Sequence, residues 1–400
     1  MPRPFKLLLP ALVLACACSA PPSTRDAAVL ADSGGPIERA LVVVTSPRRS
    51  ALRNQALIES LTRRLGPRVH MLILADPEMI VEPNPWPERM SFLRIPDGLR
   101  FSIWPQDPFV VIEGASGSRL LAARDYGRAM DSRMAALAAE QLGWPVEQSA
   151  LFFAGGNLVA DQEQLFVGRS LIDENAEELG ESPEQIVRRF EREMGRPVIP
   201  VAQVVPHIDM IVTALGGGRA AVADARAGAE LASWLLAHAP DTVQRFEQAA
   251  EANFFGDPAV RSVTDTEGRP VGAPPLAGET RRAIADSLEA AAALDGIAED
   301  LAARGYQVVR IPYLATRQAT RGAAAYPMLS YNNVLLERID GSERVYVAQY
   351  GLAPLDQAAH RAWQEAGFEV HPIPGVTTSA MYSGSVRCTV KVLERAAEVP

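Results

Sequence analysis

The sequence predicts an α/β fold assembled from repeated units. Short apolar runs typical of buried strands alternate along the chain with segments of helical periodicity. Between residues 334 and 371 these elements follow in the order strand, strand, helix, strand, and the order recurs elsewhere although the residues do not. No G-x-G-x-x-G motif opens a helix, which excludes a Rossmann fold.

Length and composition are those of an ordinary globular protein. The 400 residues are 48% hydrophobic and 22% charged, which excludes disorder, and 3 Cys are too few for a small disulfide-stapled fold. Thirty-nine Lys and Arg stand against 48 Asp and Glu, so the formal net charge is −9, and no long basic run occurs. Nucleic acid is therefore not an expected partner, and the acidic balance fits a cationic substrate better.

The individual elements follow from apolar periodicity and from their end signals. Strands are predicted over 40–45, 69–74, 120–123, 165–167, 204–215, 219–222, 306–311, 334–337, 345–349 and 368–371. Helices are predicted over about 49–65, 132–142, 182–194, 279–305 and 355–366. Ser182, Pro183 and Gln185 form a capping signal that starts the third of these helices, and Gly305 ends the fourth.

Two segments interrupt this pattern. The triple glycine at 216–218 is not followed by a helix start or a Lys, so a hairpin turn is predicted there rather than a phosphate loop. Residues of about 224–277 are first Ala-rich and helical and then Gly- and Pro-rich, and we interpret them as an insertion.

The N-terminus has the pattern of an export signal. Arg3 and Lys6 precede an apolar run over 7–15 that is too short to span a bilayer. The run ends in Val-Leu-Ala-Cys16, which resembles the lipobox of bacterial lipoproteins, whose Cys is lipidated; the alternative is a plain cleaved signal. We therefore expect a signal and linker over 1–35, a catalytic domain over 36–400, and a periplasmic, cell-envelope or secreted protein that meets a membrane only through the lipid.

A single cysteine remains beyond the signal region. Cys388, near the C-terminus, has no second thiol in that part of the chain and so cannot form an internal disulfide. The thiol is either buried and inert or kept for its reactivity. The sequence has no H-E-x-x-H, no paired C-x-x-C, no G-x-S-x-G and no Walker loop, so metal, serine-hydrolase and nucleotide sites are not expected.

Four segments place polar residues within apolar, Gly-punctuated surroundings. They are Trp104-Pro-Gln-Asp107-Pro-Phe, Phe-Ala154-Gly155-Gly156-Asn157-Leu, Pro-His207-Ile-Asp209-Met and Ser-Gly-Ser-Val-Arg387-Cys388-Thr. Within an extended segment, residues two apart project from the same face, so His207 and Asp209 are expected side by side at the start of an apolar strand.

Each segment also has an ordinary structural explanation. Asp107 before a Pro is a common turn residue, His207 with Asp209 could be a satisfied core pair, and the Gly pair could form a simple turn. Together, however, they supply one thiol, one imidazole and two carboxylates. A thiolate nucleophile needs a base or a cationic neighbour, and two carboxylates suit a planar cation such as guanidinium.

These segments, in this order, resemble the guanidine-modifying (pentein) superfamily, especially agmatine deiminases and secreted bacterial peptidyl-arginine deiminases. Trp104 and Asp107 match its W-x-x-D, His207 and Asp209 its H-x-D, and Cys388 ends its Gly-rich nucleophile segment. A Ser-Tyr-Asn-Asn run ending at Asn333 is similar to the family's S-Y-x-N. The resemblance covers about residues 104–388.

The resemblance implies the pentein fold, in which five β-β-α-β units form a five-bladed α/β propeller around a pseudo-fivefold axis. It implies a hydrolase that needs no cofactor and no metal and converts a guanidinium to a ureido group through a covalent Cys thiouronium. The catalytic residues would be Cys388, His207, Asp107 and Asp209. The residues implied to bind substrate are Trp104, Asn333, Gly155, Gly156 and Asn157.

One departure from the family bears on the substrate. Agmatine deiminases carry Glu-Gly-Gly where this chain has Ala154 before the Gly pair, which favours peptidyl-arginine or an arginine-like molecule over agmatine. Agmatine deimination, amidino transfer and ligand binding without catalysis remain the alternatives. Arg124 and Arg128 lie at a distance from Asp107 at which they could hold a substrate carboxylate, although surface arginines are the commoner explanation.

Overall fold

The computed structural model describes residues 27–45, 54–80, 88–124, 128–255, 278–316 and 326–397. Cys16, the expected lipidation site, and the rest of the expected signal lie outside these residues. Within them no helix combines the length and the apolar character needed to cross a bilayer.

The described strands form five sheets. The first sheet has the order β18 (Lys391–Arg395), β2 (Ile37–Val44), β3 (His70–Ala75) and β4 (Met90–Arg94). The second has the order β1 (Ala27–Val29), β5 (Phe109–Gly114), β6 (Gly117–Ala122) and β7 (Val146–Gln148). The third has the order β10 (Val198–Val201), β9 (Leu165–Gly168) and β8 (Leu158–Ala160).

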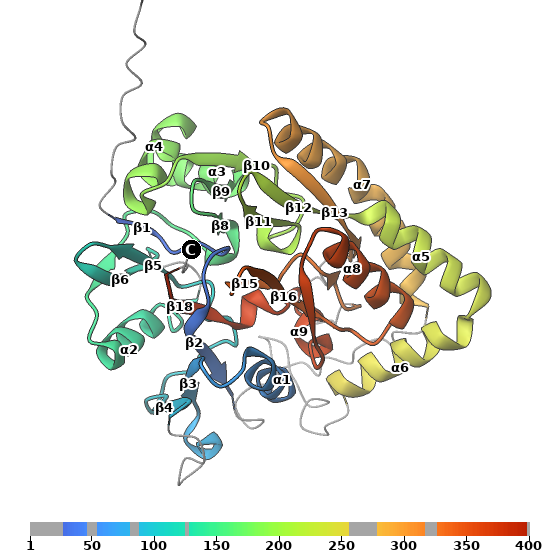
Figure 1. The fold of residues 1–400 in the computed structure, drawn as a ribbon, viewed down its shortest axis with the longest axis horizontal. Helices are drawn as coiled ribbons and strands as arrows, with labels where there is room; N and C mark the ends of the chain where they lie inside the picture. The colour runs from blue at the N-terminus through green and yellow to red at the C-terminus, as the bar shows by residue number, and fades with distance from the viewer. Residues whose placement is uncertain are drawn as a thin grey trace, which may run out of the picture.

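The remaining two sheets come from the C-terminal half of the chain. One has the order β11 (Val212–Gly216), β12 (Arg219–Asp224), β13 (Gln307–Leu314) and β14 (Leu329–Ser330). The other has the order β15 (Leu335–Ile339), β16 (Ser342–Ala348) and β17 (Glu369–Ile373). Figure 1 shows β1, β5 and β6 on the opposite side of the molecule from β12 and β13.

The strands pair in the same way in every sheet. Each sheet contains an antiparallel pair, namely β18–β2, β5–β6, β8–β9, β11–β12 and β15–β16. The second strand of each pair then lies parallel to the strand that follows it after one or more helices. A parallel partner requires such a crossover, so the predicted strand-strand-helix-strand order is confirmed.

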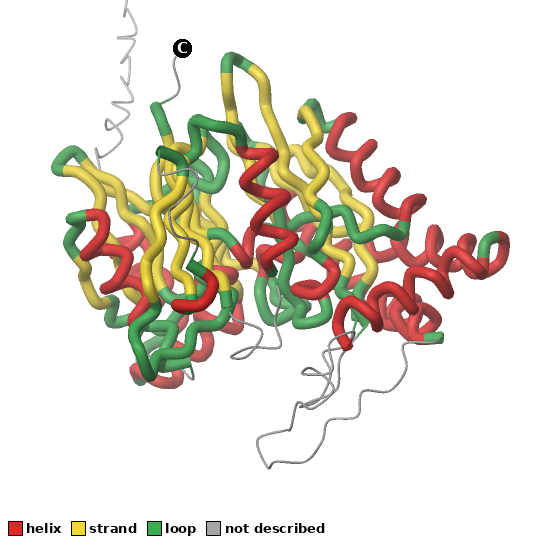
Figure 2. The backbone as a smooth tube through the Cα atoms, turned by 90° about the horizontal axis from the view of Figure 1, so that it is seen from below, coloured by secondary structure: helices red, strands yellow, loops and turns green. Residues whose placement is uncertain are grey.

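Helices supply the crossovers and cover the sheets. The longer ones are α1 (Gln55–Leu65), α2 (Arg133–Leu142), α3 (Arg169–Leu179), α4 (Pro183–Met194), α5 (Ala225–His238), α6 (Pro240–Phe255), α7 (Glu279–Ala303) and α8 (Ala353–Glu365). In Figure 1 α2, α4 and α5–α7 lie at the rim of the molecule, and Figure 2 shows strands running in a common general direction with helices flanking them. A short helix, α9 (Thr377–Ala380), precedes the last strand.

Local sequence signals explain several element ends. Ser182 and Gln185 form the predicted capping box at the start of α4, whose Ile186, Phe190 and Met194 are buried. The predicted hairpin turn joins β11 to β12, and Gly216, Gly217 and Gly218 all have positive φ there. Only glycine adopts three such angles in succession without strain.

The predicted strand over 204–215 is wrong in its first half. Ile208–Met210 form a 3-10 turn (η3), and β11 begins only at Val212. His207 and Asp209 therefore do not alternate along a strand, contrary to the expectation. The apolar run arose because Ile208 and Met210 are buried beside the site, and burial alone does not distinguish a turn from a strand.

Two expected domain boundaries also change. The linker was expected to extend to residue 35, but Ala27–Val29 form β1, which pairs antiparallel with β5, so the folded body begins earlier. The expected insertion at 224–277 begins with α5, whose Gly228 lies directly against the backbone of Tyr313 in β13. That helix is part of the repeating unit rather than an addition to it. Residues 256–277 lie outside the described part of the chain.

Candidate active site

The site lies where four non-adjacent turns meet. Asp107 precedes β5, and Gly155–Asn157 form a 3-10 turn (η2) before β8. His207 precedes η3, and Cys388 lies in the 3-10 turn η4 (Arg387–Thr389) before β18. Short turns before strands hold side chains more rigidly than long loops, because the strand fixes one end.

A pocket of about 140 Å³ opens at this meeting point. The residues that line it are Trp104, Asp107, Arg128, Pro206, His207, Met210, Met328, Tyr382, Ser383, Gly384 and Cys388. The structure therefore brings together the predicted thiol, the imidazole, the first carboxylate and the indole around one space. Aromatic and thioether side chains form much of the remaining wall.

Cys388 is buried at the base of this pocket and is the free cysteine of the described residues. Its Sγ lies 3.2 Å from Asn333 Nδ2, 3.8 Å from Asp209 Oδ2 and 3.9 Å from Met210 Sδ. Its backbone N–H donates to Asn333 Oδ1 at 3.1 Å. Burial and the Asp209 and Asp107 carboxylates raise the pKa of the Cys388 thiol well above its usual range, so these surroundings favour the protonated thiol.

Asp107 is buried, and its carboxylate accepts hydrogen bonds from two sides. The backbone N–H of Gly156 donates to its Oδ1 at 3.3 Å, and an Arg128 guanidinium N–H donates to its Oδ2. His207 Nδ1 lies 3.7 Å from Asp107 Oδ1. Burial opposes ionisation, but the nearby His207 and Arg128 outweigh it and lower the pKa of Asp107. Asp107 is thus an anion at neutral pH.

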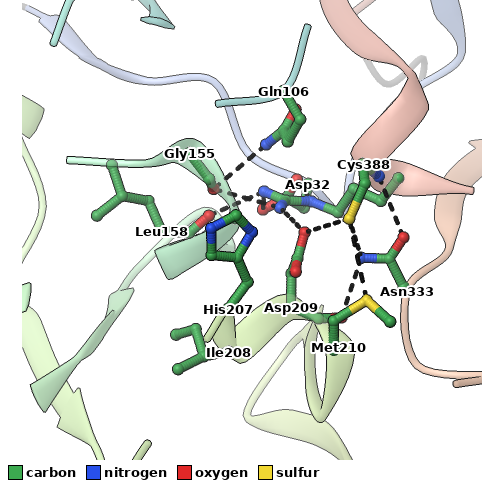
Figure 3. A network of polar contacts seen from close by, with 12 residues as sticks. Asp32, Gln106, Gly155, Leu158, His207, Ile208, Asp209, Met210, Asn333 and Cys388 are labelled. Carbon is green, nitrogen blue, oxygen red and sulfur yellow. Dashed lines mark hydrogen bonds and ion pairs between the residues drawn. The ribbon is translucent and has the colours of Figure 1, made fainter. Parts of the chain in front are cut away.

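The position of His207 depends on the two glycines of η2. A Cβ on Gly156 would lie 2.4 Å from His207 Nδ1, and one on Gly155 would lie 1.9 Å from the carbonyl oxygen of Gln106. Asn157 Oδ1 accepts the backbone N–H of Ile208 at 3.1 Å and so fixes the turn that follows the histidine. Figure 3 shows His207 and Cys388 on either side of Asp209.

Asp209 is 1% exposed, and only one of its two carboxylate oxygens has a hydrogen-bond partner among the described residues. Its Oδ2 accepts from Arg387 Nη1 at 2.8 Å, whereas its Oδ1 has no hydrogen-bond partner among the described residues. Burial raises the pKa of Asp209, and the neighbouring Arg387 and His207 oppose that effect. A buried carboxylate oxygen without a partner is costly, and Asp209 itself is not among the residues that line the pocket.

Arg387, beside the thiol, is held by a residue that the sequence analysis missed. Its Nε and Nη2 donate to the two carboxylate oxygens of Asp32 at 2.9 and 3.0 Å. Asp32 lies in the stretch predicted to be linker, 355 positions away, and nothing in its local sequence indicates a contact with the site. Lys391 was also missed: it is 4% exposed, and burial and the neighbouring Arg387 lower its pKa to about 7.

The residues predicted to bind substrate divide into two groups. Trp104 lines the pocket, and its ring packs so closely on Gly384 that a Cβ there would lie 2.2 Å from it. Gly155, Gly156, Asn157 and Asn333 do not line the pocket; they hold Asp107, His207 and Cys388 in place.

Two further residues singled out by the sequence have different surroundings. Ala154, at the position where agmatine deiminases carry Glu, is buried. Because its side chain is a methyl group, this position supplies no carboxylate. Arg124 bonds Glu178 and does not line the pocket, whereas Arg128 lines it and bonds Asp107. Among the described residues no group of three or more His, Cys, Asp or Glu is placed to hold a metal ion.

Comparison with known proteins gives similar folds but no similar sequences. No family model and no curated protein matches the sequence. The agmatine deiminase of Enterococcus faecalis superposes with a TM-score of 0.59 at 12% identity, over 92% of this chain and 96% of that one. The agmatine deiminase of C. jejuni gives a TM-score of 0.57 at 11% identity, over 93% of this chain and 97% of that one.

The chain shares its fold with these agmatine deiminases. A further structure of the C. jejuni enzyme, with substrate bound, superposes with the same TM-score of 0.57 at 10% identity, over 93% of this chain and 97% of that one. At such identities the likeness concerns the fold alone.

Proposed function

We propose that this protein is an exported, cofactor-independent hydrolase that converts a guanidinium of peptidyl-arginine or an arginine-like molecule to a ureido group and ammonia. The observation that carries the proposal is one pocket lined by the Cys388 thiol, His207 and Asp107. Beside the thiol, Asp209 Oδ2 lies 3.8 Å from Sγ, and Asp209 Oδ1 has no hydrogen-bond partner among the described residues. A guanidinium presents a planar fork of N–H donors that would satisfy this oxygen. Asp107, on the pocket wall, supplies the second carboxylate.

Substrate binding would itself activate the nucleophile. Burial and two anions, Asp209 and Asp107, keep the pKa of Cys388 high. A cation bound by Asp209 and Asp107 offsets both negative charges and lowers the cost of forming the thiolate. The thiol proton can then pass to His207, which lines the same pocket.

The reaction would proceed in two balanced halves. The Cys388 thiolate attacks the central guanidinium carbon, and a C–S bond forms. A C–N bond then breaks, and His207 gives its proton to the departing nitrogen, which leaves as ammonia. A covalent thiouronium remains on Cys388. His207 next takes a proton from water, whose oxygen attacks the same carbon. The carbonyl then forms as the adduct loses its hydroxyl proton to the solvent, where the proton converts ammonia to ammonium. The C–S bond breaks, the ureido product is released, and the Cys388 thiolate is regenerated with His207 protonated.

We infer that the pocket accepts a substrate with a free carboxylate. Arg128 lies on the pocket wall and bonds Asp107. Arg128 also lies 3.7 Å from Asp131. A substrate guanidinium would compete with Arg128 for Asp107, and a carboxylate on the substrate would offer Arg128 another anion to bind. Free arginine and peptides with a C-terminal arginine carry this group, whereas agmatine does not.

We also infer the finer architecture and the location. The five strand-strand-helix-strand units would form five blades around a pseudo-fivefold axis, which the recurrent pairing of their strands supports. The charged and apolar N-terminal run and the lipobox at Cys16 support export, with a lipid anchor or a cleaved signal.

Product analysis of the purified protein tests the activity. We expect ammonia and a citrulline-type product from C-terminal-arginine peptides or free arginine, with less from agmatine. Cys388→Ser should reduce both products to background, while Ser233→Ala, in α5 and away from the pocket, should retain activity. Ammonia release undiminished by Cys388→Ser would contradict the proposal, and a new guanidine in place of a ureido product would indicate amidino transfer.

A second candidate function is binding of cationic ligands without turnover. It is favoured by Ala154 and by the internal guanidinium groups of Arg128 and Arg387, which already pair with the two carboxylates. Titration calorimetry with arginine derivatives, combined with a haloacetamidine probe of Cys388, distinguishes the two. Binding with no product and an unreactive thiol would establish the binding function in place of catalysis.

A further inference from the structure

Arg387 is a fixed part of the protein rather than a mobile side chain. Its Nε and one Nη2 N–H bond Asp32, its Nη1 bonds Asp209 at 2.8 Å, and its Nη2 also donates to the Leu158 carbonyl at 2.8 Å. The second Nη1 N–H faces the Gly155 carbonyl at 3.4 Å. These contacts account for all five N–H donors of a guanidinium, so Arg387 has none left for a substrate.

Asp32 is held as firmly as the arginine that it binds. Its backbone N–H donates to the Ala160 carbonyl at 2.7 Å, and its Oδ2 accepts the N–H of Ala160 at 2.9 Å. These two bonds attach the N-terminal segment to β8, in another sheet. The bidentate grip on Arg387 therefore starts from a rigid backbone position.

The chain of contacts ends at the nucleophile. Asp32 binds Arg387, Arg387 binds Asp209 Oδ2, and the same oxygen lies 3.8 Å from Cys388 Sγ. Pinning Oδ2 leaves Oδ1 of Asp209 without a partner and sets its direction. Figure 3 shows Asp32, Asp209 and Cys388 around one network of contacts.

We propose that Asp32 is a positioning residue of the active site: through Arg387 it fixes the charge and the orientation of Asp209 beside the Cys388 thiol. The role in turnover rests on the proposed deiminase function. The effect on the thiol does not, because it can be measured on the protein without any substrate.

The direction in which the pKa of Cys388 shifts distinguishes a positioning role of Asp32 from a simple effect of its charge. Among its neighbours Arg387 lowers the pKa of Cys388, whereas Asp209 and Asp107 raise it. If Asp32 holds Arg387, removal of its charge lets the guanidinium move away and the thiol becomes harder to ionise. If Asp32 acts only as one more negative charge, its removal makes the thiol easier to ionise.

Other charged groups lie around the thiol. They are His207 on the segment before η3, Asp107 and Arg128 on the segments around β5, Lys391 on β18, and Tyr350 after β16. None of them bonds Asp32 in the described part of the chain, so the substitution acts first on Arg387. One of them, Lys391, senses the charge of Asp32, which opposes the lowering of its pKa by burial. With a pKa of about 7, Lys391 is already neutral at the alkaline pH at which the Cys388 thiol ionises.

The test is the pH dependence of Cys388 alkylation by iodoacetamide in the full chain, followed by mass spectrometry of the peptide that contains Cys388. For Asp32→Asn we expect the half-alkylation pH to move upward, and Asp32→Glu, which keeps a fork of two oxygens, should restore most of the change. A downward shift or an unchanged profile in Asp32→Asn would overturn the proposal.

A matched control is available in Glu337. This buried carboxylate also binds an arginine through both oxygens, Arg68 at 2.8 and 3.0 Å, and accepts a backbone N–H from Ile37 at 2.7 Å. Glu337→Gln should lower stability as much as Asp32→Asn without moving the alkylation profile. An equal shift in both variants would show loss of fold rather than loss of position.

Activity gives a second and separate readout. With a substrate that the wild type turns over, Asp32→Asn should lower kcat about tenfold or more, because a small misplacement of Asp209 slows the reaction step. If no substrate is turned over by the wild type, the proposed function fails while the alkylation result still stands. If the wild type is active and Asp32→Asn retains full kcat, the positioning proposal fails alone.

Discussion

Asn333 contacts Cys388 at two points: its side-chain oxygen accepts the cysteine N–H at 3.1 Å, and its Nδ2 lies 3.2 Å from Sγ. A neutral N–H donor directed at sulfur favours the thiolate without adding a charge. This contact is one of the few in the site that offsets the effect of the nearby carboxylates on the thiol.

We expect Asn333→Ala to slow alkylation of Cys388 about tenfold at neutral pH, since a hydrogen bond to a charged group contributes about 1.5–3 kcal/mol. Iodoacetamide kinetics measure the effect. Asn332→Ala is the control, because the side chain of Asn332 has no hydrogen-bond partner among the described residues. Equal slowing in both variants would mean that Asn333 acts only through packing.

Gly156→Ala should inactivate the protein by displacing His207. The added methyl would lie 2.4 Å from His207 Nδ1, a separation that requires the ring to move. We expect kcat to fall about 100-fold or more, because a misplaced acid–base group loses most of its contribution. Assays with the substrate found for the wild type measure this loss.

Gly296→Ala is the control for this change. Gly296 lies inside α7, and a Cβ there meets nothing within 4 Å. Alanine should raise helix stability by up to about 1 kcal/mol and leave turnover unchanged. Normal turnover in Gly156→Ala would contradict the assigned position of His207.

Arg128→Met should change the KM values for two substrates in opposite directions. Loss of the guanidinium leaves Asp107 free for the ligand, so KM for agmatine should fall, while KM for C-terminal-arginine peptides should rise because their carboxylate loses its partner. Parallel kinetics with both substrates measure the change. Arg124→Met should have no effect, since Arg124 bonds Glu178 away from the pocket; a uniform change for both substrates would count against selection by Arg128.

Lys391→Met should stabilise the protein, and more so at low pH. Lys391 is 4% exposed, forms a cation–π contact with Phe109 at 5.3 Å, and has a pKa lowered to about 7 by burial and the neighbouring Arg387. Between about pH 7 and 10.5 the unfolded chain holds a proton at this amine that the folded chain has lost, so wild-type stability rises with pH across that window.

Below pH 7 the folded protein carries the buried charge and its full cost. Urea unfolding should therefore show Lys391→Met to be more stable than the wild type by a few kcal/mol at pH 6, with the difference shrinking towards pH 10. Arg304→Met, at an exposed arginine that bonds Asp300, should show no such pH dependence. A constant difference across the range would indicate that Lys391 stays charged.

Much of the fold could be predicted from local patterns. The capping box at Ser182 and the glycine turn at 216–218 each depend on a few adjacent residues, and both are present. The four segments of the site could also be singled out, because polar residues within apolar runs are unusual. Their convergence on one pocket includes Asp107, His207 and Cys388.

Other features could not be found locally. Ile208 and Met210 gave an apolar run that looked like a strand, although they form a turn whose first N–H is held by Asn157, 51 positions away. Asp32 lay within a stretch of linker-like composition, and only its partner Arg387, brought close by the fold, gives it a role. Long-range ion pairs of this kind leave no periodic trace in a sequence.

The early start of the folded body would limit the reach of a form anchored by lipid at Cys16. Because β1 begins at Ala27, ten residues, 17–26, separate it from Cys16. Even fully extended, they span no more than about 35 Å. A form anchored at Cys16 would therefore hold the body within one protein diameter of the bilayer, and large folded proteins would be poorer clients than flexible chain ends that reach down to the membrane surface.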